Sequence, residues 1–176
     1  MVILSSLSAP AMGANTPINV DVERAADKAF MVDAAFDVNV PASIAWEVLT
    51  DYEGIGRFVS SIRQSTIKKR EGGRVLLEQH GVGHAWIVAL PMHVVLDVRE
   101  QDQRALTFRD VCGKSFTTYE GAWELATIGS ATRVTYRLKA DPNGAQPPML
   151  ARHAIRGSVK KLLDEVRQEI LARAAR

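Results

Sequence analysis

One stretch, PASIAWEVLTDYEGIGRF at residues 41–58, limits what this chain can fold into more than any other. Ile44, Val48 and Leu49 have the spacing of a short helix with one apolar side, and glycines follow at Gly54 and Gly56. Strand-like patterns lie on both sides of it. This order favours a curved sheet closed over a helix, and it argues against a nucleotide-binding fold or a helical bundle.

The rest of the chain alternates between apolar and polar residues, as half-buried strands do. In residues 133–139, for example, Val134, Tyr136 and Leu138 alternate with Arg, Thr and Arg, which is typical of an antiparallel sheet with one wet face. The same reasoning predicts strands at 29–40, 62–70, 74–80, 93–100, 104–111, 115–125 and 133–139, and a long amphipathic helix from 149 to the end. We therefore predict an α+β fold with a sheet of about seven strands, two short helices after the first strand and a long C-terminal helix. A bent sheet and a long helix enclose a concave apolar space, which is where small ligands bind.

Composition sets few further limits. The chain has 176 residues, 47% hydrophobic and 24% charged, which suits one globular domain. The formal net charge of +2 is too small to indicate a nucleic-acid partner. Cys112 is the single cysteine, so it forms no disulfide within the chain, and we interpret it as a small strand residue. The oligomeric state is left open by the sequence.

The first 28 residues are expected to form a leader or arm, with the ligand-binding domain at 29–176. An apolar stretch at the start ends in small residues such as Ala9 and Ala11, a pattern cut by signal peptidase, but a charged region in front of it is missing. One hypothesis is the rear half of a secretory signal, which would make the protein exported or periplasmic. The alternative is a leader without this role on a cytoplasmic protein.

The order of the elements resembles the START-like superfamily, also called SRPBCC or the birch-pollen-allergen fold. Within it, the chain is similar to the polyketide cyclase/dehydrase and lipid-transport family, which includes coenzyme Q-binding proteins. The resemblance covers roughly residues 29–173. It rests on the element order and on the residues of the first helix and the short helix after it: Trp46, Val48, Leu49, Asp51, Tyr52 and Phe58.

The resemblance implies a helix-grip fold with a deep cavity between the sheet and the C-terminal helix. It implies that the protein binds or carries a hydrophobic small molecule: a lipid, a quinone or a polycyclic compound. We expect the pocket to be lined by Phe58, Leu77, Trp86, Phe108, Arg109, Tyr119, Trp123, Tyr136, Met149 and His153. Core packing is the alternative interpretation for each aromatic residue. Trp46 is expected to fix the first helix.

Polar residues give no recognisable catalytic motif. His80, His84 and His93 cluster around a glycine-rich bend, but their spacing matches no metal motif, and we expect neither a metal nor a cofactor. Arg109 is expected either to pair with a ligand carbonyl or carboxylate, or to pair across strands with Glu120 or Glu124. We therefore expect a binding protein rather than an enzyme.

Two other functions stay open. One is an aromatase/cyclase or dehydratase that acts on a polyketide-like substrate, for which Arg109, His84, His93 and Tyr119 are the polar candidates. The other is a protein-interaction module, which an exposed apolar patch would indicate. Residues 150–176 hold seven Arg or Lys against three Asp or Glu. That face of the helix is expected either to be solvated or to touch anionic lipid transiently.

Overall fold

A computed structural model describes residues 17–85, 88–144 and 147–176 of the chain, so the predicted pocket residue Trp86 lies outside it. The elements, in chain order, are β1 (Asn19–Arg24), β2 (Phe30–Val38), α1 (Ala42–Leu49), the 3-10 turn η1 (Ile55–Arg57), β3 (Ile62–Glu71), β4 (Arg74–Ala85), β5 (Val88–Gln101), β6 (Ala105–Asp110), β7 (Phe116–Ile128), β8 (Ala131–Pro142) and α2 (Pro148–Ala174).

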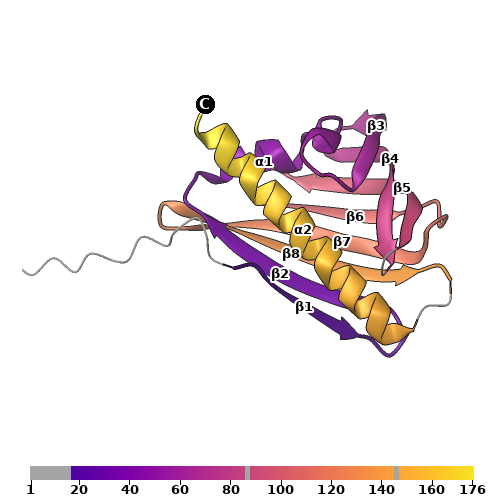
Figure 1. The fold of residues 1–176 in the computed structure, drawn as a ribbon. Helices are drawn as coiled ribbons and strands as arrows, with labels where there is room; N and C mark the ends of the chain where they lie inside the picture. Colours follow the sequence, from indigo (N-terminus) through magenta and orange to yellow (C-terminus); the bar gives the residue numbers. More distant parts are fainter. Residues whose placement is uncertain (1–16, 86–87, 145–146) are drawn as a thin grey trace, which may run out of the picture.

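The strands form one antiparallel sheet in the order β1-β2-β8-β7-β6-β5-β4-β3. The chain enters at one edge, crosses to the other through α1 and η1, and returns strand by strand until β8 pairs with β2 (Figure 1). The predicted α+β helix-grip architecture is therefore confirmed, with a long curved sheet and a C-terminal helix.

The structure has one strand more than the sequence predicts, because residues 19–24 form β1 rather than part of a polar arm. Val20 and Val22 alternate with polar residues and are buried, while Asn19 and Asp21 are exposed. This strand is short and lies at the sheet edge, where it pairs only with β2. Its two apolar residues are too few to stand out in a sequence pattern of this kind.

The first helix forms where the sequence places it. Pro41 is extended, with φ −61° and ψ 149°, and starts α1, which buries Ala45 and Val48. Asp51 follows the helix and accepts a hydrogen bond from the backbone N–H of Gly54 through its carboxylate, at 3.1 Å. This bond holds the elbow that leads into η1 and β3.

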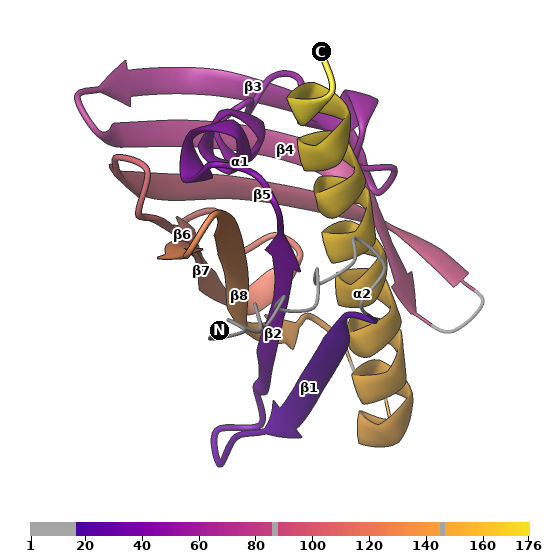
Figure 2. The ribbon, with the colours of Figure 1, turned by 90° about the vertical axis from the view of Figure 1, so that its left-hand side faces the viewer.

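Helix α2 lies across one face of the sheet (Figures 1 and 2). Its main backbone contacts are with β1 and β2 near one edge, with β4 near the other, and with α1. The central strands β5 to β8 are not among those main contacts in the described part of the chain. The helix therefore bridges the two sides of the sheet and lies over the buried side chains of the central strands.

The core lies between the sheet and the two helices. Alternate residues of the central strands, such as Val98, Phe108 and Val134, are buried together with Leu163 and Ile170 of α2. Among the described residues, no helix combines the length and hydropathy needed to cross a bilayer.

Candidate functional site

Five aromatic rings form a continuous cluster on the face of the sheet that α2 covers. The ring of Trp123 lies 4.5 Å from that of Tyr136, which stacks at 6.3 Å on Phe108. Phe108 in turn lies 5.7 Å from Tyr119, and Tyr119 lies 4.5 Å from Phe116. These centroid distances are those of favourable aromatic pairs. The rings come from β6, β7 and β8, the strands that α2 does not approach closely, and together they form what we call the aromatic floor.

Two phenol groups give the aromatic floor its polar character. The side chains of Tyr119 and Tyr136 interact with each other, and burial raises the pKa of both phenols. The Asp110 carboxylate, which lies near Tyr119, raises the pKa of that phenol further. Both phenols are therefore neutral at ordinary pH. A neutral phenol can donate a hydrogen bond to an oxygen acceptor.

Burial decreases along the aromatic floor. Trp123, Tyr136 and Phe108 are buried, whereas Tyr119 and Phe116 are only half-buried. Several other apolar side chains that pack on the core are also half-buried, among them Met92 on β5 and Ile155 and Leu162 on α2. The half-buried end lies near the β6–β7 loop, where a site open to a ligand would have its rim.

Asp110 organises that loop. Its carboxylate accepts hydrogen bonds from the backbone N–H groups of Val95, Cys112 and Gly113 at 2.9, 3.1 and 3.0 Å. Because these bonds occupy both carboxylate oxygens, Asp110 serves the loop geometry and is poorly placed to act as a general base.

Phe116 was missed by the sequence reasoning, for a structural reason. Simple alternation puts residues 116 and 119 on opposite faces of a strand. A register shift between Phe116 and Thr118, where β7 pairs with β8, moves the Phe116 ring to the face of Tyr119. An irregularity of this kind leaves no distinctive signal in a single sequence.

The structure brings five of the predicted pocket residues to the face that α2 covers. Phe108, Tyr119, Trp123 and Tyr136 belong to the aromatic floor, and Leu77 is buried on β4. Their role in ligand binding stays a prediction.

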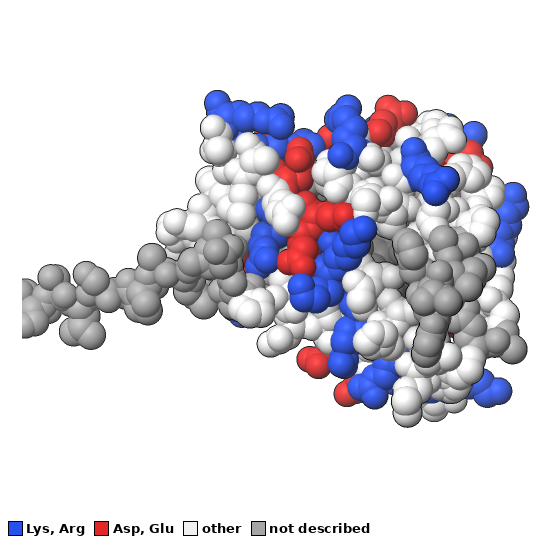
Figure 3. All heavy atoms as spheres, in the orientation of Figure 1, with Lys and Arg blue, Asp and Glu red and all other residues white. Residues whose placement is uncertain are grey.

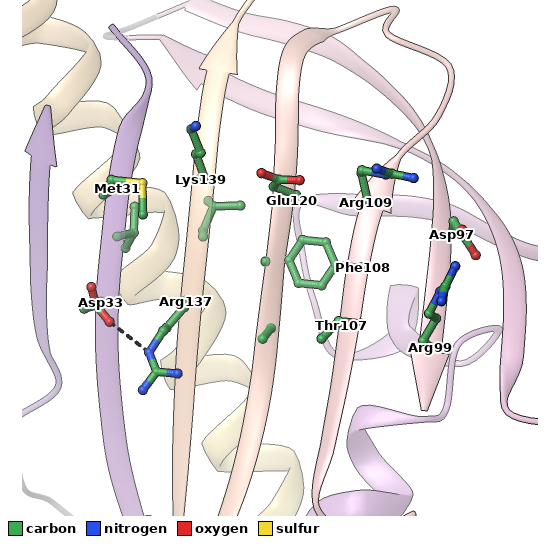
Figure 4. Close-up of a pocket in the computed structure, with 14 residues that line it drawn as sticks. Met31, Asp33, Asp97, Arg99, Thr107, Phe108, Arg109, Glu120, Arg137 and Lys139 are labelled. Carbon is green, nitrogen blue, oxygen red and sulfur yellow. Dashed lines mark ion pairs between the residues drawn. The ribbon is translucent and has the colours of Figure 1, made fainter. Parts of the chain in front are cut away.

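Among the residues that line the outer groove drawn in Figure 4, Phe108 is buried, whereas Arg109, its neighbour on β6, is exposed and leaves the opposite face of the strand. It is in register with Glu120 across β6 and β7, as the cross-strand alternative expected. There it lines an outer groove of about 510 Å³, whose polar residues include Asp33, Arg99 and Arg137. Arg109 therefore cannot reach a ligand held between the sheet and α2.

Phe58 lies at the other end of the molecule from the rim. It lines a charged pocket of about 450 Å³ beside the end of α2, and the Arg173 guanidinium lies 5.8 Å from its ring. Arg173 also contacts Asp51 at 2.6 Å and Glu169 at 2.8 Å, so this region fastens α2 to the α1–η1 segment. Met149, 82% exposed, and His153, also exposed, lie at the start of α2 and outside the aromatic floor.

The basic face of α2 is partly neutralised. Lys160 pairs with Asp164 at 2.6 Å, and Arg167 reaches the same carboxylate at 2.8 Å. Figure 3 shows acidic and basic side chains intermingled along the helix, without a uniformly basic surface on this face. Contact with a membrane surface stays a prediction that these ion pairs do little to support.

His93 and His80 lie on the outer face as well, because Leu77 and Gln79 of the same strand β4 are buried and His80 alternates with them. Both histidines point at Glu78, with Nε2–Oε1 distances of 3.0 Å for His93 and 3.7 Å for His80. The side chain of His84 lies outside the described residues.

Comparison with known families agrees with this architecture. The family model for polyketide cyclase / dehydrase and lipid transport matches residues 29–170, and the chain belongs to that family. No match was found among curated protein sequences.

Several solved structures share the fold. A STAR-related lipid transfer protein from Xanthomonas axonopodis has 19% sequence identity and a TM-score of 0.69, covering 94% of this chain and 97% of that one. Human STARD10 has 12% identity and a TM-score of 0.70, covering 89% and 70%. The Zhui aromatase/cyclase from Streptomyces sp. R1128 has 17% identity and a TM-score of 0.67, covering 83% and 93%. At these identities the likeness shows the fold alone, and it includes both a lipid-transfer protein and an aromatase/cyclase.

Proposed function

We propose that this protein binds a hydrophobic small molecule between the sheet and α2, with the molecule lying on the aromatic floor. The observation that carries the proposal is the aromatic floor itself: a run of five rings from buried Trp123 to half-buried Phe116, on strands that α2 bridges without close backbone contact. Burial of ligand surface against these rings supplies the affinity, at roughly 25 cal/mol per Å² before the costs of association.

The phenol pair narrows the class of ligand. Because Tyr119 and Tyr136 have raised pKa values, they act as neutral hydrogen-bond donors and not as bases. The best match is an apolar body with a carbonyl or hydroxyl oxygen, as a quinone, a polycyclic ketone or a fatty acid provides. The hydroxyls lie within the ring cluster, so the oxygen enters first and an apolar remainder extends toward the half-buried rim.

A binding role accounts for the polar groups better than catalysis does. Two of the four candidates for a cyclase-type reaction, Arg109 and His93, lie on the face away from the aromatic floor. The side chain of His84 lies outside the described residues, and the neutral phenol of Tyr119 favours donation of a hydrogen bond over abstraction of a proton.

Displacement of a fluorescent probe, 1-anilinonaphthalene-8-sulfonate, by oleate, decylubiquinone and 2-naphthol tests the proposal. We expect at least one of the three to displace the probe at micromolar concentration. Ile155→Trp, which adds bulk at a half-buried position in the first part of α2, should weaken that binding at least about tenfold. Arg109→Ala is the matched control, since its side chain is exposed on the outer face. Equal affinity in the wild type and Ile155→Trp, or a loss confined to Arg109→Ala, would refute the proposed site.

Tyr119→Phe and Tyr136→Phe test the polar contact separately. If the phenols donate to the ligand, these variants should lose affinity for decylubiquinone by about 5- to 30-fold, the range of one or two kcal/mol for a hydrogen bond. Equal affinity of the wild type and these variants would show that the phenols do not contact the ligand and that apolar burial alone supplies the affinity.

A further inference from the structure

The side chains of Glu78, His80 and His93 meet on the outer face of the sheet, which is the face opposite to the aromatic floor. Glu78 and His80 lie two residues apart on β4, so both point to the same face. His93 of β5 is paired in register with His80, and the two imidazole rings lie 4.1 Å apart. The hairpin register therefore assembles a set of donors that linear spacing does not reveal.

The donor atoms have the separations that a small divalent ion needs. Oε1 of Glu78 lies 3.0 Å from Nε2 of His93 and 3.7 Å from Nε2 of His80. One donor atom from each residue lies within 4.8 Å of the others. Ligands about 2.0–2.1 Å from a tetrahedral Zn²⁺ are about 3.3–3.4 Å from each other, so the observed distances bracket that value.

We propose that Glu78, His80 and His93 form a binding site for a divalent transition-metal ion, with Zn²⁺ the best match. Two imidazoles and one carboxylate suit zinc, copper or nickel, whereas magnesium and calcium prefer oxygen ligands alone. The side chains are 26%, 45% and 22% exposed in the order given, so the fourth coordination position faces solvent. An ion there would hold an exchangeable water and tie β4 to β5.

Two lysines contact the proposed metal ligands, and a bound metal ion would compete with one of them. Lys68 contacts Oε2 of Glu78 at 3.0 Å, which leaves Oε1 directed at the histidines. Lys114 contacts Nδ1 of His93 at 3.2 Å. A lysine ammonium can only donate, so Nδ1 accepts and the ring carries its proton on Nε2, which donates to Glu78. Metal binding moves this proton from Nε2 to Nδ1 through solvent, and Lys114 withdraws.

Isothermal titration of the full chain with ZnCl₂ tests the site. We expect one equivalent of Zn²⁺ to bind, and Glu78→Gln, His80→Ala and His93→Ala each to weaken binding at least about tenfold, the lower limit for loss even of a group that supports a ligand. His153→Ala is the matched control, because His153 is an exposed histidine on α2. Lys114→Ala should bind zinc more tightly, since it removes the competing donor.

A second readout guards against variants that fail to fold. The wild type should gain thermal stability with zinc and not with the same concentration of MgCl₂, while Glu78→Gln, a conservative change at a half-exposed position, should gain none. The proposal is overturned if the wild type binds no zinc at ~100 μM free ion, or if the three ligand variants bind as the wild type does. Weaker zinc binding by Lys114→Ala would contradict the proposal that Lys114 competes with the metal ion at His93. Probe displacement by oleate or decylubiquinone should be unchanged in these variants, so the two proposals fail independently.

Discussion

Most of the buried residues of helix α2 lie between Val159 and Ile170, and Leu163→Ala measures how much this segment contributes to stability. Four of its five buried residues lie between Val159 and Ile170, and Leu163 is 0% exposed within the core. Toward the start of the helix, Ile155 is only half-buried. A helix fixed at one end and looser at the other would let a ligand enter without unfolding the domain.

The expected loss of stability follows from the burial of the Leu163 side chain. Replacing a fully buried leucine by alanine costs about 2–5 kcal/mol, and sites that cannot collapse lie in the upper part of that range. Because Leu163 is fully buried in the core, we expect a loss of about 3 kcal/mol. For a domain of this size that is a fall in Tm of about 6–12 °C. Ile155→Ala removes a half-buried side chain and should cost about 1 kcal/mol.

Urea denaturation followed by circular dichroism measures both variants. Equal m-values in the wild type and the variants would confirm that the differences reflect stability and not a changed unfolded state. The reasoning is refuted if Leu163→Ala costs less than about 1 kcal/mol, or if Ile155→Ala costs as much as Leu163→Ala.

Three other substitutions test separate parts of the structure. Asp97, which is 7% exposed and bonded to Arg74 at 2.7 and 3.0 Å, has a pKa below its ordinary value of 3.8, chiefly because of the hydrogen bonds from Arg74. Its contribution to stability is therefore present above pH 3.8 and is lost as the pH falls through the lowered pKa. Asp97→Asn should cost about 1–3 kcal/mol in urea denaturation at pH 7 and less at about pH 2.5, and an equal cost at both pH values would contradict this. Gly81→Ala should destabilise the β3–β4 pair by at least about 1 kcal/mol, because its new Cβ would overlap the carbonyl oxygen of Ser61; an unchanged Tm would show that the backbones can separate freely. Arg173→Met should lower the Tm by a few degrees and do so less in 1 M NaCl, since half-buried ion pairs to Asp51 and Glu169 are lost; a salt-independent loss would point to packing instead.

The element order could be predicted because several strands, such as β2 and β8, have an apolar side that alternates with a polar one. Val134, Tyr136 and Leu138 of β8 are all buried, as their alternation requires. The helix-forming segment 42–49 and the long last helix follow from apolar spacing in the same way. Short edge strand β1 has only Val20 and Val22 to identify it, and it was assigned to the arm.

The candidate site was predictable only in part, because register and irregularity decide which side chains meet. Inward alternation correctly brought Tyr119, Trp123 and Tyr136 together. Alternation would have excluded Arg109, which shares a strand with buried Phe108 and lies on its other face. Phe116 depends on a bulge, and the meeting of His80 with His93 depends on the exact pairing of two strands. Neither can be read from one sequence.

A spin-labelled fatty acid tests the central claim most directly. In the NMR spectrum of the protein with 16-doxyl-stearate, paramagnetic broadening reports which side chains lie near the bound chain. A ligand held on the aromatic floor should broaden the ring signals of Tyr119 and the methyl signals of Ile155, and leave the Met31 methyl on the outer face sharp. Broadening of Met31 with Tyr119 unaffected, or no broadening at all under saturating probe, would contradict the account.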